Sequence, residues 1–190
     1  KTELRYGIIG AGSMGREHIE NIKVMGGAAV TAISDPHTPS QEAALAMAPG
    51  AKVFSDHRAL LESGLVDAVV IATPNDTHAA VLKDVLESDL AVFVEKPLAT
   101  TVEDLKSILA WDEKRNAMTW MGLEYRFMPP VAEAIARAKE GEAGKIHQVS
   151  IREHREPFYP KVDNWNRFAE RTGGTLVEKC CHYFNLMDIV

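Results

Sequence analysis

Cysteine is nearly absent from this 190-residue sequence, and its only two cysteines, Cys180 and Cys181, are adjacent. Neighbouring cysteines rarely pair with each other because the geometry is strained, so we expect reduced thiols in a cytoplasmic protein. An excess of basic residues is also missing. The net charge is −6, which argues against nucleic acid or an anionic membrane surface as a partner. The sequence has no apolar run long enough to span a bilayer, and no signal peptide is apparent.

The end of the sequence lacks a helix-terminating signal. Residues 188–190 lie within an apolar-periodic segment, with no glycine, proline or polar cap after them. Natural domains seldom end in this way. We therefore expect the sequence to be the N-terminal part of a longer protein.

A glycine-rich turn lies between a short apolar run and an amphipathic segment near the amino terminus. Gly10, Gly12 and Gly15 follow the run in the spacing Gly-x-Gly-x-x-Gly. This pattern predicts a strand, a tight turn and a helix. The first glycine permits the turn, the second lets a pyrophosphate approach the backbone, and the third lets the helix pack closely on the strand. We expect the helix start at Ser13 and Met14 to face the phosphates.

An acidic residue, Asp35, ends the second predicted strand, 29–34. It follows the glycines by about 20 residues, where an acid typically holds the ribose 2′-hydroxyl of a dinucleotide. The spacing therefore predicts a dinucleotide site. The alternative is a structural turn with an incidental acid after it, in which case the spacing is chance.

Strand-like and helix-like periodicities alternate through residue 122. Strands alternating with helices indicate a doubly wound parallel sheet, the Rossmann-type α/β architecture. We predict a dinucleotide-binding domain over 1–122. The predicted strands are 6–9, 29–34, 52–54, 68–71, 90–94 and 118–122.

The pattern changes after that point. Residues 146–154 alternate like a strand with one solvent-exposed face, and 156–172 are irregular. We predict that 123–190 begin a second, α+β domain built on a large open sheet whose other strands lie outside this sequence.

Ligands of open parallel sheets bind beyond the carboxyl ends of the strands. Besides the glycine turn, two such ends carry candidate residues, 73–75 and 95–97. Lys96 stands at the mouth of a buried strand, just before a proline that restricts its backbone. Such a lysine suits proton transfer, whereas the alternative is a solvated surface lysine.

The last predicted helix would place Glu178, His182 and Asn185 on one face, because they are spaced i, i+4 and i+7. A carboxylate and an imidazole one turn apart can be a catalytic pair, a metal pair or a surface pair. No third ligand stands at a fixed spacing, so we predict no metal. The two cysteines nearby are interpreted as core residues rather than nucleophiles.

Some polar residues carry weaker signals. Arg152 and His154 would touch substrate if their predicted strand faces the cleft, and are otherwise solvated. Trp165 and Arg167 indicate either a cofactor contact or a packed loop. His78, at the start of the fourth predicted helix, is interpreted from the residues alone as a packing or capping residue.

Four motifs together resemble the glucose–fructose oxidoreductase / inositol dehydrogenase (Gfo/Idh/MocA) family. They are Gly10–Gly15, Ala72–Asn75 with His78, Glu95–Pro97, and Gly173-Gly174 followed by an acid and His182. The resemblance covers the whole sequence in the right order. It implies a two-domain NAD(P)-dependent enzyme of about twice this length. The second domain of such enzymes has a large open sheet often used for oligomerisation, so the resemblance implies a homo-oligomer, a dimer or a tetramer.

The resemblance also implies roles for single residues. Lys96 matches the catalytic lysine, with a peptide before Pro97 that is commonly cis, and His182 matches the histidine that works with that lysine. Glu178 stands where many members have a substrate-binding aspartate, which leaves the substrate open. Tyr125 and its neighbour Arg126 resemble an Asn/Arg-type pair of the family. The expected cofactor-binding residues are Gly10, Gly12, Ser13, Met14, Gly15, Asp35, Thr73, Pro74, Asn75, His78, Glu95, Lys96, Arg126, Trp165 and Arg167.

The function expected from the resemblance is hydride transfer between nicotinamide and a secondary alcohol of a sugar, inositol or related polyol. His182 would exchange the hydroxyl proton and Lys96 would polarise the oxygen. NAD is expected over NADP because no arginine directly follows Asp35. The alternatives are an NAD-dependent glycosidase of the same fold and a non-catalytic NAD-binding protein. The expected substrate-binding residues are Glu178, Asn185, Arg152, His154 and Tyr125.

Overall fold

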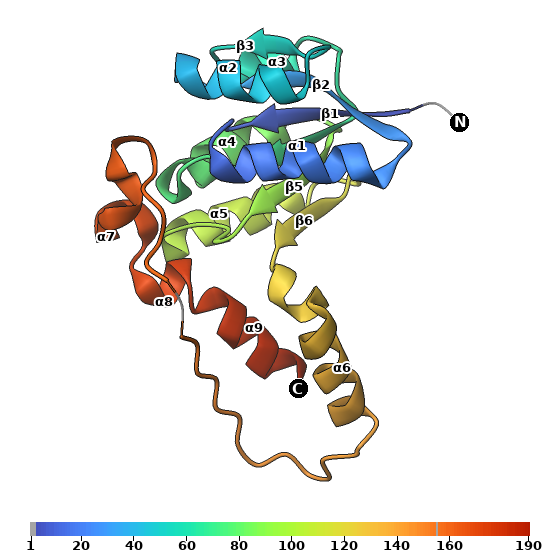
Figure 1. Ribbon diagram of the computed structural model, residues 1–190, viewed down its shortest axis with the longest axis vertical. Helices are drawn as coiled ribbons and strands as arrows, with labels where there is room; N and C mark the ends of the chain where they lie inside the picture. Colours follow the sequence, from blue (N-terminus) through green and yellow to red (C-terminus); the bar gives the residue numbers. More distant parts are fainter. Residues whose placement is uncertain (1–2, 155) are drawn as a thin grey trace.

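The computed structural model describes residues 3–154 and 156–190. Within these residues, parallel strands form one twisted sheet in the order β3-β2-β1-β4-β5-β6 (Figure 1). The predicted doubly wound sheet is therefore confirmed. From β1 the chain adds β2 and β3 on one side of β1, and then returns to add β4, β5 and β6 on its other side. The strand order therefore reverses between β1 and β4, and a ligand of such a sheet binds in the crevice at the carboxyl ends of these two strands. The strands are β1 Leu4–Ile9, β2 Ala28–Ser34, β3 Lys52–Phe54, β4 Ala68–Ile71, β5 Ala91–Glu95 and β6 Thr119–Gly122.

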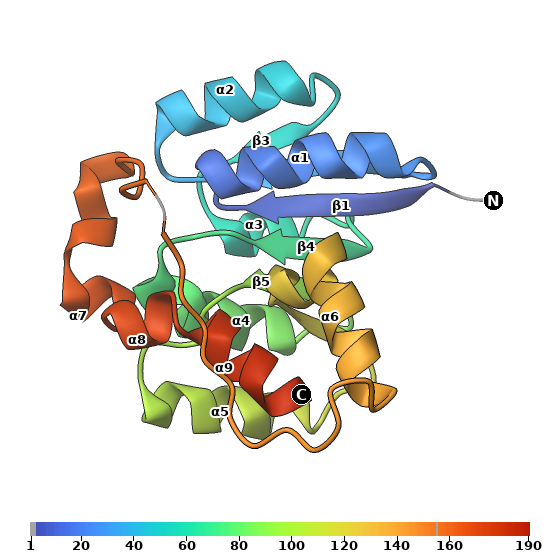
Figure 2. The same ribbon diagram turned by 60° about the horizontal axis from the view of Figure 1, so that its bottom comes forward.

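Helices cover both faces of the sheet (Figures 1 and 2). One apolar cluster lies on the side of α1 and α2, and another lies on the side of α3, α4 and α5. Consecutive strand residues alternate between the clusters, as Ile8 and Ile9 do, and β4 is buried along its whole length. This double burial explains the continuous apolar run of β4. The helices are α1 Ser13–Met25, α2 Thr38–Met47, α3 His57–Leu61, α4 His78–Leu86 and α5 Val102–Asp112.

The residues after the sheet, 123–190, are called here the C-terminal segment. Its helices lie beyond the carboxyl edge of the sheet and beyond β6 (Figure 1). Both α6 and α9 contact η2, the short turn that follows β6. The elements are η2 Glu124–Phe127, α6 Pro129–Lys139, η3 Val162–Arg167, α7 Ala169–Thr172, α8 Thr175–Glu178 and α9 Cys181–Ile189.

The predicted strand over 146–154 is wrong, since these residues have no regular secondary structure. A strand is stabilised by hydrogen bonds to neighbouring strands, and within the described residues every strand belongs to the first sheet. Alternating side chains alone therefore do not form a strand here.

No helix among the described residues has the length and apolarity needed to cross a membrane.

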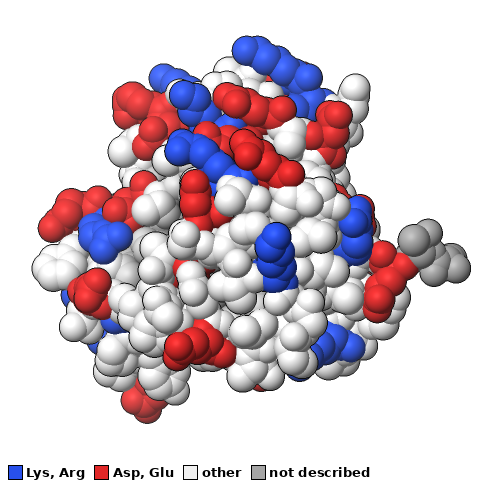
Figure 3. All heavy atoms as spheres, turned by 90° about the horizontal axis from the view of Figure 1, so that it is seen from above, with Lys and Arg blue, Asp and Glu red and all other residues white. Residues whose placement is uncertain are grey.

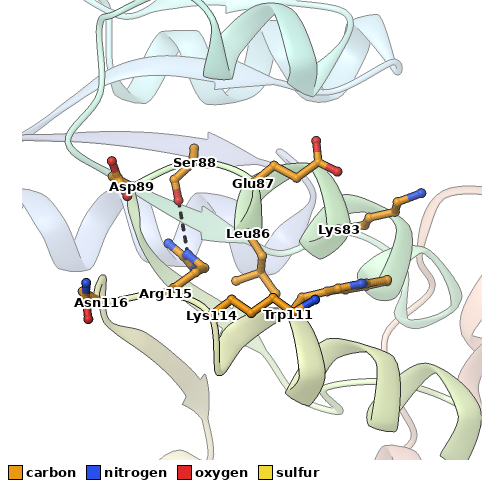
Figure 4. Close-up of a pocket in the computed structure, with 9 residues that line it drawn as sticks. All are labelled: Lys83, Leu86, Glu87, Ser88, Asp89, Trp111, Lys114, Arg115 and Asn116. Carbon is orange, nitrogen blue, oxygen red and sulfur yellow. Dashed lines mark hydrogen bonds between the residues drawn. The ribbon is translucent and has the colours of Figure 1, made fainter.

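A cavity of about 360 Å³ lies at the end of the sheet opposite the glycine turn, between the carboxyl ends of α4 and α5 and the starts of β5 and β6 (Figure 4). Beside it, the Arg115 guanidinium donates to the carbonyl oxygens of Ser88, at 3.2 Å, and Leu90, at 2.5 Å. Arg115 thus ties the two connections together.

Two glycines bring the start of α1 against the strand ends. A Cβ at Gly15 would lie 1.9 Å from the carbonyl oxygen of Gly10. Gly10 itself has a φ of +94°, and a Cβ there would lie 2.6 Å from the carbonyl of Ala72, directly after β4. Glycine is therefore required at both positions by backbone contacts within the protein.

We predict that Gly15→Ala lowers the free energy of unfolding by about 1–3 kcal/mol, because the added methyl group must push α1 away from the turn. Urea unfolding would measure the change. Gly50→Ala is the matched control, since a Cβ at this exposed glycine meets nothing within 4 Å, and its effect should stay within about 0.5 kcal/mol. Equal stabilities of the two variants would contradict the prediction.

Candidate functional site

The glycine turn and Asp35 lie together at the carboxyl edge of the sheet. The Asp35 carboxylate accepts hydrogen bonds from the backbone N–H of Ala11, at 2.7 Å, and of His37, at 2.8 Å. These two bonds hold the carboxylate beside the turn that precedes α1. The predicted ribose-binding acid is therefore adjacent to the predicted phosphate-binding turn.

The start of α1 leaves backbone donors for a ligand. The N-cap residue Gly12 makes no side-chain capping bond, and the first turn of α1 contains no acidic residue. The first N–H groups of a helix have no partner within the helix. A Cβ at Gly12 would meet no atom within 4 Å, so there is open space above the backbone, and Ser13 and Met14 are exposed beside it. These residues fit the diphosphate of a dinucleotide.

The end of β4 continues into Thr73 and Pro74, which are half-buried, and Asn75, which is buried. The Asn75 amide donates to the carbonyl oxygen of Thr172 at 3.4 Å. His78 is fully buried, and its ring nitrogens lie 2.7 Å and 3.1 Å from the carbonyl oxygens of Pro97 and Thr73. Burial lowers the pKa of His78. Its ring thus braces the ends of β4 and β5, and both of its nitrogens are occupied by these carbonyl oxygens.

The end of β5 carries Glu95 and Lys96. The buried Glu95 carboxylate lies 2.8 Å from Nε2 of His18, on α1, and its second oxygen accepts the backbone N–H of Lys96 at 3.2 Å. Despite its burial, Glu95 has a lowered pKa, because His18 is hydrogen-bonded to it and Lys96 lies nearby. The Lys96–Pro97 peptide is cis, as the resemblance implied. The carboxylate therefore fixes the backbone from which Lys96 extends.

Lys96 reaches the C-terminal segment. Its Nζ donates to the carbonyl oxygen of Glu178 at 3.2 Å. In a continuous helix that oxygen would accept the N–H of His182, but this N–H points to the carbonyl of Lys179 instead. The helical run is interrupted, with α8 ending at Glu178 and α9 beginning at Cys181. The single helix face predicted for Glu178, His182 and Asn185 is therefore wrong, and the break supplies the oxygen that Lys96 binds.

His182 lies at the start of α9 and is 2 % exposed. Its ring stacks on Tyr125, with centroids 4.1 Å apart, and Nε2 lies 3.6 Å from a carboxylate oxygen of Glu124. Burial, together with the positive charges of Lys96 and Lys179, lowers its pKa to about 4. Nδ1 is buried without a hydrogen-bond partner in the structure. The imidazole is therefore neutral near pH 7.

Lys179 and Glu153 were not expected from the sequence. The Lys179 side chain is nearly buried, with Nζ 3.0 Å from the Glu153 carboxylate and 4.4 Å from the centroid of the Tyr125 ring. Tyr125 donates to the same carboxylate at 3.3 Å, and so does Tyr183. Glu153 lies between Arg152 and His154, and the predicted strand would turn it to the opposite face from these two residues. Nothing in the spacing of these residues signals that they meet.

The remaining predicted residues are exposed or make other contacts. Arg152 and His154 are exposed, and Asn185 is half-buried on α9. Arg126 contacts the ring of Phe127, and its Nε is buried without a partner in the structure. Trp165 is half-buried, and Arg167 donates to the carbonyl oxygen of Phe158 at 2.6 Å. The structure does not bring these side chains to Lys96 through a direct contact.

Acidic and basic side chains are interspersed on the face seen in Figure 3. Among the described residues, no group of three or more histidine, cysteine or acidic side chains is placed to hold a metal ion.

Two family models match the chain. The NAD-binding Rossmann fold of the Gfo/Idh/MocA oxidoreductase family matches residues 4–123, and the C-terminal alpha/beta domain of the same family matches residues 132–190. Inositol 2-dehydrogenase 2 of Paenarthrobacter aurescens is 36% identical over 77% of this chain and 46% of its own length. Inositol 2-dehydrogenase of Rhizobium meliloti is 30% identical over 96% of this chain and 53% of its own length.

Solved structures give the same result. Myo-inositol dehydrogenase of Lactobacillus casei, in complex with NAD(H) and myo-inositol, has a TM-score of 0.69 and 32% identity, covering 73% of this chain and 42% of that one. A putative myo-inositol dehydrogenase of Sinorhizobium meliloti has a TM-score of 0.81 and 26% identity, covering 98% and 54%. The chain spans about half the length of the curated relatives it matches. Its sequence, its sheet and both matched models place the chain in the Gfo/Idh/MocA family of NAD-binding oxidoreductases.

Proposed function

We propose that the complete enzyme is an NAD-dependent dehydrogenase that acts on a secondary alcohol of a sugar, an inositol or a related polyol. The observation that carries the proposal is the contact of Lys96, at the end of β5, with the helix break that precedes His182. This contact supports the proposal, because it joins the ammonium group of Lys96, at the carboxyl edge of the sheet, to the segment that carries His182. Relatives named inositol 2-dehydrogenase and a neighbour solved with NAD(H) and myo-inositol support the substrate class.

The residues divide the work of alcohol oxidation. NAD, when bound, supplies the acceptor for the hydride. His182, neutral because of its lowered pKa, accepts the hydroxyl proton as general base. Lys96 places a positive charge where the alkoxide develops. Stacking on Tyr125 keeps the imidazole plane fixed, and we assign orientation of the substrate ring to the side chain of Glu178. In the reverse direction His182 returns the proton.

Cofactor choice rests on Asp35. Its carboxylate is held at the turn by Ala11 and His37, where it can accept a hydrogen bond from a ribose hydroxyl and would repel a 2′-phosphate. The proposed assignments of Gly10, Gly12 and Thr73 to the same site follow from their positions at the strand ends. This geometry favours NAD over NADP.

The proposal extends to organisation. We assign 1–122 to the dinucleotide domain and 123–190 to the start of the substrate domain. Phe184 and Met187 of α9 and Phe127 of η2 are exposed apolar residues, which supports burial against further protein and a homo-oligomer, a dimer or a tetramer. Cys180 and Cys181 are free thiols in the structure, which supports a cytoplasmic location.

The direct test is an absorbance assay for reduced nicotinamide, with NAD and separately with NADP, over a panel of inositols, sugars and sugar acids. We expect reduction of NAD with one substrate class. Reduction of NADP alone would refute the role of Asp35. Sugar release without net change of NAD would favour the glycosidase, and binding of NAD without either reaction would favour a non-catalytic protein.

Lys96→Ala should reduce turnover by about 10²- to 10⁴-fold with little change in NAD affinity, because the ammonium group stabilises charge that develops during the reaction. Lys106→Ala, at an exposed lysine of α5, is the matched control and should leave turnover unchanged. Steady-state kinetics and NAD titration of both variants measure the effect. Normal turnover of Lys96→Ala would reject the role given to this lysine.

The low pKa of His182 has a consequence for stability. An unfolded histidine binds its proton near pH 6.5 and folded His182 only near pH 4. Between these two pH values the unfolded state therefore binds more protons than the folded state, so the free energy of unfolding decreases as the pH falls from about 6.5 to about 4. We expect urea unfolding to show a larger loss from pH 7 to pH 5 in the wild type than in His182→Gln.

The titration itself can be observed by NMR. The ring proton signal that disappears in His182→Gln should titrate near pH 4 in the wild type. A midpoint near pH 6.5 would show that the ring is solvated and would remove the basis for its neutral form.

A further inference from the structure

A lysine of the C-terminal segment reaches the start of α1, beside the glycine turn. Lys161 directly precedes η3, and its Nζ donates to the hydroxyl oxygen of Ser13, the first residue of α1. The two residues are 148 positions apart in the sequence. Figure 2 shows the loop around η3 beside the start of α1. The contact therefore brings a side chain of the second domain to the phosphate end of the first.

Charged groups of both signs surround Lys161. Its side chain is half-buried, burial lowers its pKa, and the nearby charges of Lys96 and Arg16 lower it further, while Glu95 and Glu178 act in the opposite direction. The carboxylate of Glu95 is already bound to His18 and to the backbone of Lys96. The partner of Lys161 in its hydrogen bond, Ser13, is a neutral hydroxyl.

The start of α1 adds positive charge beside Lys161. The first turn of α1 has no acidic residue and no side-chain cap, so its N–H groups present a partial positive charge. An ammonium group and the free N–H groups of a helix start favour an anion between them. Ser13 borders the open space above Gly12, so a bound diphosphate would lie within reach of Lys161.

We propose that Lys161 clamps the diphosphate of the dinucleotide by exchanging the Ser13 hydroxyl for a phosphate oxygen. The inference rests on the proposed NAD site and adds a ligand-binding residue from the C-terminal segment. A lysine is suited to this role, because its ammonium is a point charge on a flexible stem that can follow a phosphate oxygen. The contact would also hold the segment around η3 over the bound cofactor.

The test is calorimetric titration of Lys161→Ala and Lys161→Arg with NAD and with ADP-ribose, which retains the diphosphate but lacks nicotinamide. Loss of a charge-assisted hydrogen bond should weaken binding of both ligands by roughly 10- to 100-fold in Lys161→Ala. Lys161→Arg should recover most of the affinity, because it keeps the positive charge. Lys145→Ala, which removes an exposed lysine of the same segment, is the matched control and should bind normally.

Adenosine, which has no phosphate, separates a phosphate contact from general damage. Its binding, followed by ligand-observed NMR, should be the same in wild type and Lys161→Ala. Equal losses for adenosine and NAD, or unchanged NAD affinity, would overturn the clamp while leaving the dinucleotide site intact. Failure of the wild type to bind either NAD or ADP-ribose would overturn the NAD site and the clamp together.

Discussion

The close contact between the glycine turn and the first turn of α1 is the constraint on which the rest of the site depends. Only glycine allows α1 to begin there, because any Cβ at Gly15 would overlap the carbonyl oxygen of Gly10. The contact decides where the positive end of the helix points. Asp35 is then held against the same turn by the N–H of Ala11, and Lys161 arrives over Ser13. Backbone packing therefore sets the dinucleotide end of the site before any side-chain chemistry.

The other end of the site is assembled by polar contacts between the sheet and the C-terminal segment. Arg171 of α7 pairs with Asp76 after β4 at 3.0 Å, and Lys96 binds the oxygen exposed by the break between α8 and α9. Several apolar side chains of this segment remain exposed. Hydrogen bonds and ring stacking, rather than an apolar core, hold His182 near the end of β5.

The sheet and the dinucleotide turn could be predicted from the sequence because both depend on local patterns. A parallel strand buried on two faces is an apolar run, and a backbone turn of this kind needs glycine at fixed spacing. The meeting of Glu153 and Lys179 depends instead on how distant segments fold together, which no spacing records. The break before His182 could not be predicted, because helical periodicity continues through it. The carbonyl oxygen that the break exposes accepts a hydrogen bond from Lys96. The strand over 146–154 failed because a strand also needs partners.

The partner of Lys96 is a main-chain oxygen, and this has a consequence for variation at position 178. Any residue at position 178 presents the same carbonyl group, so mutation of that side chain leaves the anchor of the lysine in place. Position 178 can therefore vary between aspartate, glutamate and other residues without removing the oxygen that the Lys96 amine binds. On the roles proposed for Lys96 and Glu178, a change of side chain at position 178 would alter substrate preference and leave the lysine in place, and a designer could randomise residue 178 on the same basis.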